Sequence, residues 1–487
     1  MSNLTTKKIK GKECKFATYV PPSEPGIPDL HFVKEVIHYE DGTKEVNMKE
    51  LYDMEFPFWV TKRGMQNHEQ KKEWAPIETL DMYKSTRANR QQRLARALNM
   101  TQYAHDPFHM RKLMGSPYVY GADILTTAVI KREYQVKYPG ITSMFSVGVI
   151  DIETDVIHGH GGIIMLSFTM GSICVTAVTQ EAVKDKPNIV DDVDKMMNKY
   201  LGKYVTERKL QPLLYIVEDE FEVIRVVFEH IHKAQPDFLA VWNLDFEITN
   251  FIAAAERCGR DLAPVTSDPK LDPKYHYFQY KQGPKQKKTS SGKLSPIKPA
   301  AQWHTVYTPA SFYFVDAMCA YKHTRLGKQE EQSYSLDAIL TKEKLPNKLD
   351  IPEAEGYTGL AWHKFMQKYH MAEYIVYNRF DCIGVEILEE KVKDLPAVMP
   401  GLCATSDFEN MKSQPRRVVD ALHWVCLDEE HVIGTTANSI VDEHDDLTLS
   451  REDWIITLPA PLITANGLKL IEENEELRTS IYGHVGD

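Results

Sequence analysis

Two carboxylates stand two residues apart at the end of an apolar run. Asp151 and Glu153 lie near the end of the segment FSVGVIDIET, directly after the apolar residues 147–150. Such a run predicts a buried strand, in which residues two apart project from the same face. The two side chains should therefore lie next to each other, where they can hold a cation or act as an acid–base pair. Solvated charges at the end of a strand are the alternative.

Two further acidic segments lie far along the chain. Residues 242–247 (WNLDFE) stand where a predicted strand, PDFLAVWN, passes into a predicted helix. The segment YNRFD places Tyr377 and Asp381 four residues apart in a predicted helix, which puts both on one helical face. A carboxylate with a phenol one turn away suits metal-assisted hydrolysis, because the carboxylate can hold a divalent ion while the hydroxyl aligns a water. Each pattern is common when it occurs alone.

The elements around these segments alternate between strands and helices. After the first strand, GGIIMLSFTM and SICVTAVT predict two more strands and an antiparallel start to a sheet. FYFVDAM is a further predicted strand. Three segments predict helices: EDEFEVIRVVFEHIHKA, EITNFIAAAERCGR with Gly259 as its C-cap, and YHMAEYIVYNRFDCIGVEILEEKVKD. The pattern predicts an α/β (α+β) fold that brings the acidic segments together.

Basic residues concentrate in two segments. Residues 281–298 hold six lysines and no acid, together with several turn-forming residues, which predicts a mobile loop or the tip of a hairpin. A predicted helical stretch nearer the N-terminus has a basic residue at every third position, so its charges drift slowly around one side. It is either a solvated helix face or a patch that tracks phosphates. Its members are Lys84, Arg87, Arg90, Arg93 and Arg96.

Length and composition exclude several classes of protein. A chain of 487 residues predicts two or three domains. The net charge of −11 argues against indiscriminate nucleic-acid binding but leaves room for a local basic groove. Seven scattered cysteines without a CxxC pair indicate buried thiols in a reducing compartment rather than disulfides or a zinc ribbon. Without a signal peptide or an apolar run long enough for a membrane span, we expect a soluble cytoplasmic protein.

The three acidic segments in this order form a far more specific sequence signal than any one of them alone. D-x-E on a first strand, N-x-x-F-acid, and Y-x-x-x-D on a helix resemble the three exonuclease motifs of family B DNA polymerases, of a phage-like type. These motifs belong to the DEDDy branch of the ribonuclease-H-like exonucleases. The resemblance spans about residues 145–395 and includes the lysine-rich insertion, where these polymerases carry a β-hairpin.

The resemblance implies a layout of three parts. Residues 1–140 would form an N-terminal α+β domain. Residues 141–400 would form the exonuclease domain, with a central mixed sheet flanked by helices and a lysine-rich hairpin at about 275–305. Residues 401–487 would hold connecting helices and the start of the palm.

The resemblance also implies a site and an activity. Asp151, Glu153, Glu247 and Asp381 would hold two Mg²⁺ ions, for which Mn²⁺ can substitute, since all the ligands are hard oxygens. Tyr377 would orient the attacking water. The activity would be proofreading removal of nucleotides from single-stranded 3′ ends of primer–template DNA, in the host cytoplasm if the protein is viral. The expected DNA contacts are Asn243, Phe246, Lys285, Lys287, Lys288 and Lys293.

The sequence departs from the family pattern in two ways. The second motif usually ends in Asp, whereas this chain has Glu247, whose carboxylate reaches one methylene further. Asp245 is the alternative ligand, although it could instead cap the following helix. The SLYP-type and DTD-type polymerase motifs are missing, so we expect a separate polymerase polypeptide, or the remainder of a longer polymerase, to cover Ile481, Tyr482 and Val485 near the C-terminus. A free-standing trimming exonuclease on DNA or RNA, and a non-catalytic replication scaffold, remain the other hypotheses.

Overall fold

The computed structural model describes residues 7–22, 24, 26–105, 109–288, 292–325, 330–347, 349, 351–395 and 414–435. The C-terminal residues Ile481, Tyr482 and Val485, and most of the predicted third part, lie outside this range. The chain divides into two compact units. The first comprises Met1–Pro57, Lys84–Arg90 and Ile124–His431, and the second comprises Phe58–Tyr83, Gln91–Asp123 and Val432–Asp487.

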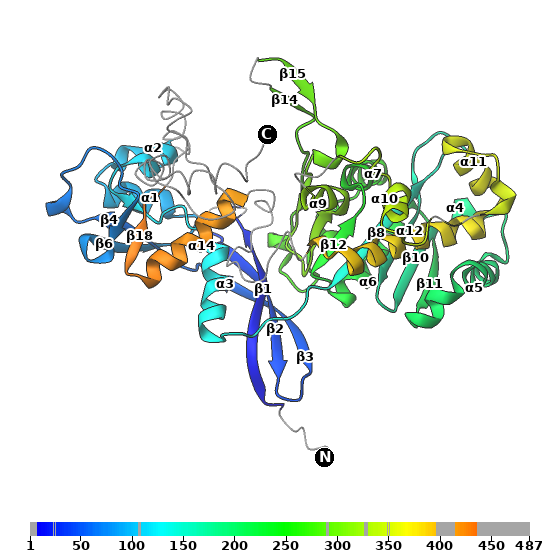
Figure 1. Ribbon diagram of the computed structural model, residues 1–487, viewed down its shortest axis with the longest axis horizontal. Coiled ribbons are helices and arrows are strands. Elements are labelled where there is room, and N and C mark those ends of the chain that lie inside the picture. The colour runs from blue at the N-terminus through cyan, green and yellow to red at the C-terminus, as the bar shows by residue number, and fades with distance from the viewer. Residues whose placement is uncertain are drawn as a thin grey trace, which may run out of the picture. The chain divides into compact units, whose positions relative to one another are not determined.

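A six-stranded mixed sheet forms the centre of the first unit (Figure 1). Its strands lie in the order β11-β10-β9-β8-β12-β17. Pairing is antiparallel between β8 and β9 and between β9 and β10, which confirms the predicted antiparallel start. It is parallel from β8 to β12 and β17, so these three strands end at the same edge. The strands are β8 (Val147–Thr154), β9 (Ile163–Met170), β10 (Ile173–Thr179), β11 (Gln211–Val217), β12 (Phe238–Val241) and β17 (Tyr313–Asp316).

Helices cover both faces of this sheet, which confirms the predicted α/β class. Helices α5 and α12 lie over one face, with α10 and α11 packed against α12, whereas α6, α7 and α8 cover the other. Along β8, Val149 belongs to the core beneath α12, while Ile150 and Ile152 belong to the core beneath α6 and α7. Since side chains alternate along a strand, Asp151 and Glu153 face α12. The helices are α5 (Ile189–Glu207), α6 (Glu220–Ala234), α7 (Leu244–Cys258), α8 (Ala263–Thr266), α10 (Leu336–Lys342), α11 (Gly359–Tyr369) and α12 (Met371–Val392).

A buried arginine fixes the position of α12 on the sheet. Arg379 is only 1% exposed, and its Nε donates to Thr176 Oγ1 of β10 over 2.9 Å. Its Nη2 donates to the carbonyl oxygen of Leu213 in β11 over 3.0 Å. Because a buried guanidinium is costly unless it is hydrogen-bonded, these contacts oppose any sliding of α12. They therefore set the position of Asp381, two residues further along.

An N-terminal antiparallel sheet is joined to the central sheet by a buried ion pair. Lys34 Nζ lies 2.8 Å from Asp237 Oδ1, and both side chains are almost fully buried. Lys34 also donates to the carbonyl oxygens of Gln235 and Pro236, just before β12. Asp237 Oδ2 accepts from the backbone N–H of Ser146, just before β8. This N-terminal sheet consists of β1 (Ile9–Val20), β2 (Leu30–Tyr39) and β3 (Lys44–Tyr52), with α3 (Thr126–Lys137) against β1.

The predicted basic helix near residue 90 is only partly correct. Helix α1 begins at Arg90, whereas Lys84 lies in β6 and Arg87 lies before the helix. Arg90 is also buried, so the basic residues do not form one solvated stripe. Helix α1 packs in the second unit, whose core includes Phe58 and Leu94. This unit's elements are β4 (Phe56–Thr61), β5 (Trp74–Pro76), β6 (Leu80–Ser85), α1 (Arg90–Ala97), α2 (Met110–Gly115), β7 (Val119–Tyr120) and most of β18 (His431–Ile433).

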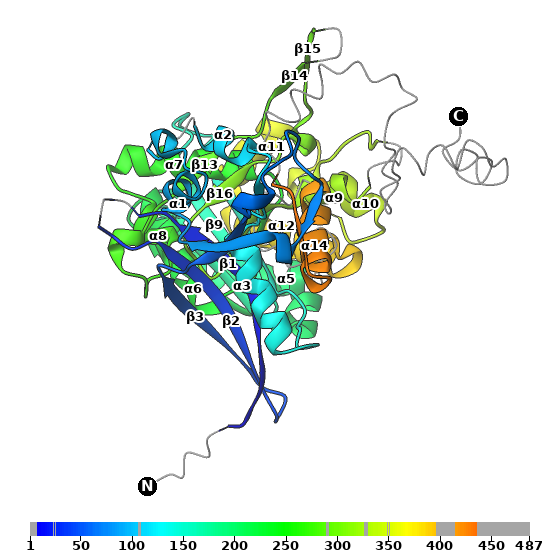
Figure 2. The ribbon, with the colours of Figure 1, turned by 90° about the vertical axis from the view of Figure 1, so that its left-hand side faces the viewer.

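The lysine-rich segment forms a two-stranded antiparallel ribbon. Strands β14 (Gln286–Lys288) and β15 (Leu294–Pro296) pair with each other, and the ribbon projects from its unit in both views (Figures 1 and 2). Strands β13 (Gln279–Lys281) and β16 (Thr305–Tyr307) pair near its base. The hairpin alternative of the prediction is therefore the one observed. Lys285, Lys287 and Lys293 are exposed.

The remaining elements complete the first unit. Helix α9 (Ala317–His323) follows β17, α4 (Gln180–Val183) follows β10, and α14 (Gln414–Asp428) precedes β18. In the part of the chain with a described structure, no helix is both long and apolar enough to cross a membrane.

The cysteines among the described residues are free thiols, without disulfide bonds. The prediction that they are buried holds for four and is wrong for two that are partly exposed, namely Cys258 and Cys426.

Candidate metal centre

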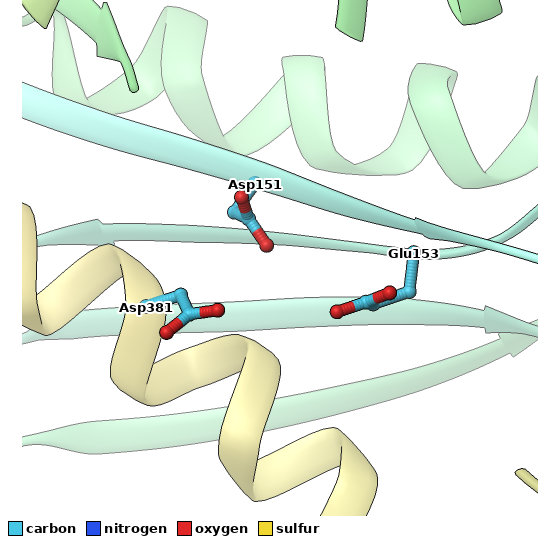
Figure 3. A group of neighbouring side chains, drawn as sticks. All are labelled: Asp151, Glu153 and Asp381. Carbon is cyan, nitrogen blue, oxygen red and sulfur yellow. The ribbon is translucent and has the colours of Figure 1, made fainter. Parts of the chain in front are cut away.

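Three carboxylates from two elements converge on one point. Asp151 and Glu153 extend from β8 and Asp381 from α12, and one oxygen from each lies within 4.8 Å of the others. Figure 3 shows the three side chains directed toward a common space. Among the described residues, no other group of three His, Cys, Asp or Glu side chains approaches this closely. We call these residues the acidic triad; its oxygens could hold a metal ion.

Polar side chains of α12 hold the two strand carboxylates. Asn378 Nδ2 donates to Asp151 Oδ2 over 2.7 Å, and the Tyr374 hydroxyl donates to Glu153 Oε2. Asn378 and Tyr374 are four residues apart on a helix, which is about 6 Å along its axis. Asp151 and Glu153 are two apart on a strand, which is about 6.6 Å. The two spacings match, so one helical face contacts both acids.

Side chains of helix α11 support the contact between Tyr374 and Glu153. His363 Nδ1 lies 2.7 Å from the Tyr374 hydroxyl and 3.6 Å from Glu153 Oε2. Gln367 Nε2 donates to the carbonyl oxygen of Thr154 over 2.7 Å. Burial and the Glu153 carboxylate raise the pKa of Tyr374 well above its ordinary value, so its hydroxyl remains a donor. Sequence reasoning missed Tyr374, Asn378, His363 and Gln367; the first two share a helical face with Asp381, which is the signal that could have found them.

Tyr377 lies against the triad, as the Y-x-x-x-D spacing predicts. Its hydroxyl hydrogen-bonds Asp381, and its side chain is buried. Burial, followed by the charges of Asp381, Glu153 and Asp151, raises the pKa of Tyr377 well above its ordinary value. The phenol therefore stays protonated and can donate to a water or a substrate oxygen. It is not suited to removing a proton.

Glu247 lies beside the triad rather than within it. It sits in the first turn of α7 and is 3% exposed. Burial raises its pKa well above the ordinary value, and the nearby charges of Asp316 and Glu153 raise it further. Its Oε2 has no hydrogen-bond partner. The metal-free protein therefore favours a protonated Glu247, and its role as a fourth ligand stays a prediction.

Asp316 is an additional acid that sequence reasoning missed. It ends β17, and its Oδ1 accepts from the backbone N–H of Cys319 over 2.8 Å as the N-cap of α9. Its Oδ2 accepts from the backbone N–H of Leu244 at the start of α7, over 3.3 Å. Burial raises the pKa of Asp316 to about 6. An acid at the end of the predicted strand FYFVDAM was the available signal.

Asp245 does not have the capping role considered for it. The cap position of α7 is Asn243, and Asp245 lies inside the first turn, so the capping hypothesis is wrong. Its Oδ1 accepts from the Tyr280 hydroxyl over 2.5 Å and from Gln282 Nε2 over 2.9 Å. Burial raises the pKa of Asp245, but these two hydrogen bonds, together with the charges of His304 and Lys285, outweigh it and lower the pKa below the ordinary value. Asp245 is therefore held by the segment around β13 and is not a member of the triad.

Two predicted DNA contacts from the same segment are accessible. Asn243 is exposed, and Phe246 is 44% exposed although it is aromatic.

No protein-family model matches this chain, and no curated protein sequence matches it.

Proposed function

We propose that this chain is a metal-dependent 3′→5′ exonuclease acting on DNA, with the acidic triad as its cation site and a ribonuclease-H-like exonuclease fold. The main support is that Asp381 converges within 4.8 Å on Asp151 and Glu153, which lie more than two hundred residues earlier in the sequence. Further support comes from Tyr377, whose hydroxyl reaches Asp381 from one turn away. The mixed sheet, with β8 between an antiparallel and a parallel neighbour, agrees with such a fold.

The residues present fit a divalent cation. Three carboxylate oxygens this close repel one another unless a cation or protons lie among them, and hard oxygen donors suit Mg²⁺ or Mn²⁺. A bound cation would supply a water of lowered pKa and charge stabilisation for the leaving 3′ oxygen. Asp151, Glu153 and Asp381 would bind it, and Glu247 is the proposed fourth ligand after loss of its proton.

The chain's other residues would orient the reacting groups. Asn378 and Tyr374 keep the strand carboxylates in place through the hydrogen bonds described above. Tyr377 would turn its single hydroxyl proton from Asp381 to the attacking water and so hold the water in line. Phe246, half exposed beside the site, offers an aromatic face on which a terminal base can stack. Asn243 and the hairpin lysines would contact the strand, and a polymerase-bearing polypeptide is the proposed partner.

A gel experiment separates this function from its rivals. Single-stranded DNA labelled at its 5′ end is incubated with the protein and either Mg²⁺ or EDTA, beside the variant Asp151→Asn/Glu153→Gln. We expect a ladder of products shortened from the 3′ end only with the unaltered protein and Mg²⁺. Equal or faster shortening of labelled RNA would favour a trimming ribonuclease. No shortening of either substrate would favour the non-catalytic scaffold.

A further inference from the structure

A second concave site lies in the first compact unit, and none of the residues of the acidic triad lines it. It is a cavity of ≈ 640 Å³ between β1, the segments 277–279 and 303–308, and β17. This volume lies within the range of about 300–1,000 Å³ that is typical of small-molecule sites. Its walls are rich in aromatic side chains, namely Tyr19, Tyr277, Phe278, Trp303, Tyr307, Tyr313 and Phe314.

The exposed charge among the described residues that line this cavity is positive. Arg87 is the only Lys or Arg side chain among the described residues that line it, and it is exposed, with its guanidinium carbon 4.1 Å from the Tyr19 ring centroid. The carboxylate among the described lining residues is that of Asp316, which is 1% exposed, and its two oxygens accept backbone N–H groups, as described above. The cavity's other polar side chains include the hydroxyl groups of Thr18 and Thr305. A ligand with a planar apolar part and a negative charge matches this lining.

We propose that this cavity binds a nucleotide unit, with the base between the aromatic side chains and the phosphate at Arg87. Stacking of a base on an aromatic side chain suits every base, because each has a flat π-face. An arginine that already stacks on Tyr19 is positioned to pair with a phosphate, since guanidinium binds phosphate oxygens through paired N–H groups.

The same chemistry has two possible sources. A free deoxynucleoside monophosphate would enter as a small molecule, whereas a nucleotide within a single strand would bring its neighbours along the surface. The proposal goes beyond the proposed exonuclease function and does not require it, because none of the triad residues lines the cavity. It gives the protein a second point of contact with nucleic acid or with its hydrolysis product.

Binding is measured in EDTA with the full-length Asp151→Asn/Glu153→Gln variant, so that no probe is cleaved. The probes are deoxyadenosine monophosphate and a short fluorescein-labelled oligothymidylate, followed by quenching of tryptophan fluorescence and by anisotropy. Trp303 lines the cavity, so Trp303→Phe should remove most of the nucleotide-dependent quenching. Saturable binding of the monophosphate that competes with the oligonucleotide indicates the free-nucleotide source, and binding of the oligonucleotide alone indicates the strand.

Two variants and a matched control decide whether the cavity is responsible. Arg87→Gln should raise the Kd about tenfold and lower the log–log salt slope of oligonucleotide binding by about 0.7, the loss of one phosphate contact. Tyr277→Leu should raise the Kd about 5- to 100-fold through lost stacking. Arg93→Gln, at an exposed arginine outside the cavity lining, should change neither.

The proposal is overturned if neither probe binds, or if Arg87→Gln and Tyr277→Leu, with unchanged circular dichroism spectra, bind as the parent does. Should Tyr277→Leu fail to fold, the exposed Arg87 alone decides. These outcomes are independent of the gel above: cleavage without cavity binding contradicts only this proposal, and cavity binding without cleavage contradicts only the exonuclease.

Discussion

Neutralising one carboxylate of the acidic triad should stabilise the metal-free protein. Each pair of unit charges 4.8 Å apart repels by about 0.9 kcal/mol in water and about 3.5 kcal/mol at an effective dielectric constant near 20. Asp151 takes part in two such pairs and is partly exposed. Because solvent screens exposed charges, the repulsion in each pair is close to the value in water, and the sum for Asp151 is about 2 kcal/mol. Asp151→Asn keeps the shape and an oxygen that can still accept from Asn378. The acceptor of that hydrogen bond is no longer charged, which weakens the bond by about 1 kcal/mol.

The net stabilisation of about 1 kcal/mol corresponds to a rise of about 1 °C in melting temperature in EDTA for a chain of this length. Melting is followed by differential scanning fluorimetry with EDTA and with millimolar Mg²⁺. The unaltered protein should gain stability on adding Mg²⁺, as any ligand that binds only the folded state requires, and Asp151→Asn should gain much less. Glu256→Gln, which neutralises an exposed carboxylate on α7, should melt as the unaltered protein does under both conditions. The reasoning is refuted if Asp151→Asn melts below the unaltered protein in EDTA, or if Mg²⁺ leaves the unaltered protein unchanged.

Three further predictions concern groups around the triad and the joint between the sheets. Tyr374→Phe removes the donor to Glu153 while keeping the ring, so nuclease assays over a range of Mg²⁺ concentrations should show a higher Mg²⁺ requirement; an unchanged requirement would remove this positioning role. Lys34→Met leaves the Asp237 carboxylate buried and unpaired, and urea unfolding should show a loss of about 3–5 kcal/mol, against under about 1 kcal/mol for the exposed Lys8→Met. Burial raises the pKa of Asp316 to about 6, so the folded state binds its proton more tightly, and metal-free stability should fall as pH rises from about 4 to 6. Urea titrations should find this fall diminished in Asp316→Asn; an identical pH profile would contradict it.

The sequence was sufficient to predict the site where the period of a strand or helix alone decides from which face a side chain projects. The two-residue spacing of Asp151 and Glu153 predicts a shared face, and the four-residue spacing of Tyr377 and Asp381 predicts their contact; both are observed. The strands β8, β9 and β10 are equally clear, because each contains a run of mainly apolar residues that is buried on both faces.

The sequence was insufficient where tertiary contacts decide. Strand β11 was not predicted because it alternates between exposed and partly buried residues at the edge of the sheet, where Pro212 is tolerated. The environment of Glu247 depends on Asp316, which reaches it from a strand about seventy residues further along. The supporting contacts of His363 and Gln367 come from a separate helix, whose packing no local pattern specifies.

The most direct test of the central claim is the rate at which the terminal nucleotide leaves a 3′-labelled DNA strand. Single-stranded DNA labelled in its last nucleotide is mixed with excess protein and Mg²⁺, and release of labelled mononucleotide is timed for the unaltered protein and for Asp381→Asn. Loss of one carboxylate of the triad should remove several kcal/mol of transition-state stabilisation and slow release about 100- to 1,000-fold, while the melting temperature in EDTA stays the same or rises. Release at the same rate in Asp381→Asn, or labelled products longer than one nucleotide from the unaltered protein, would contradict the account.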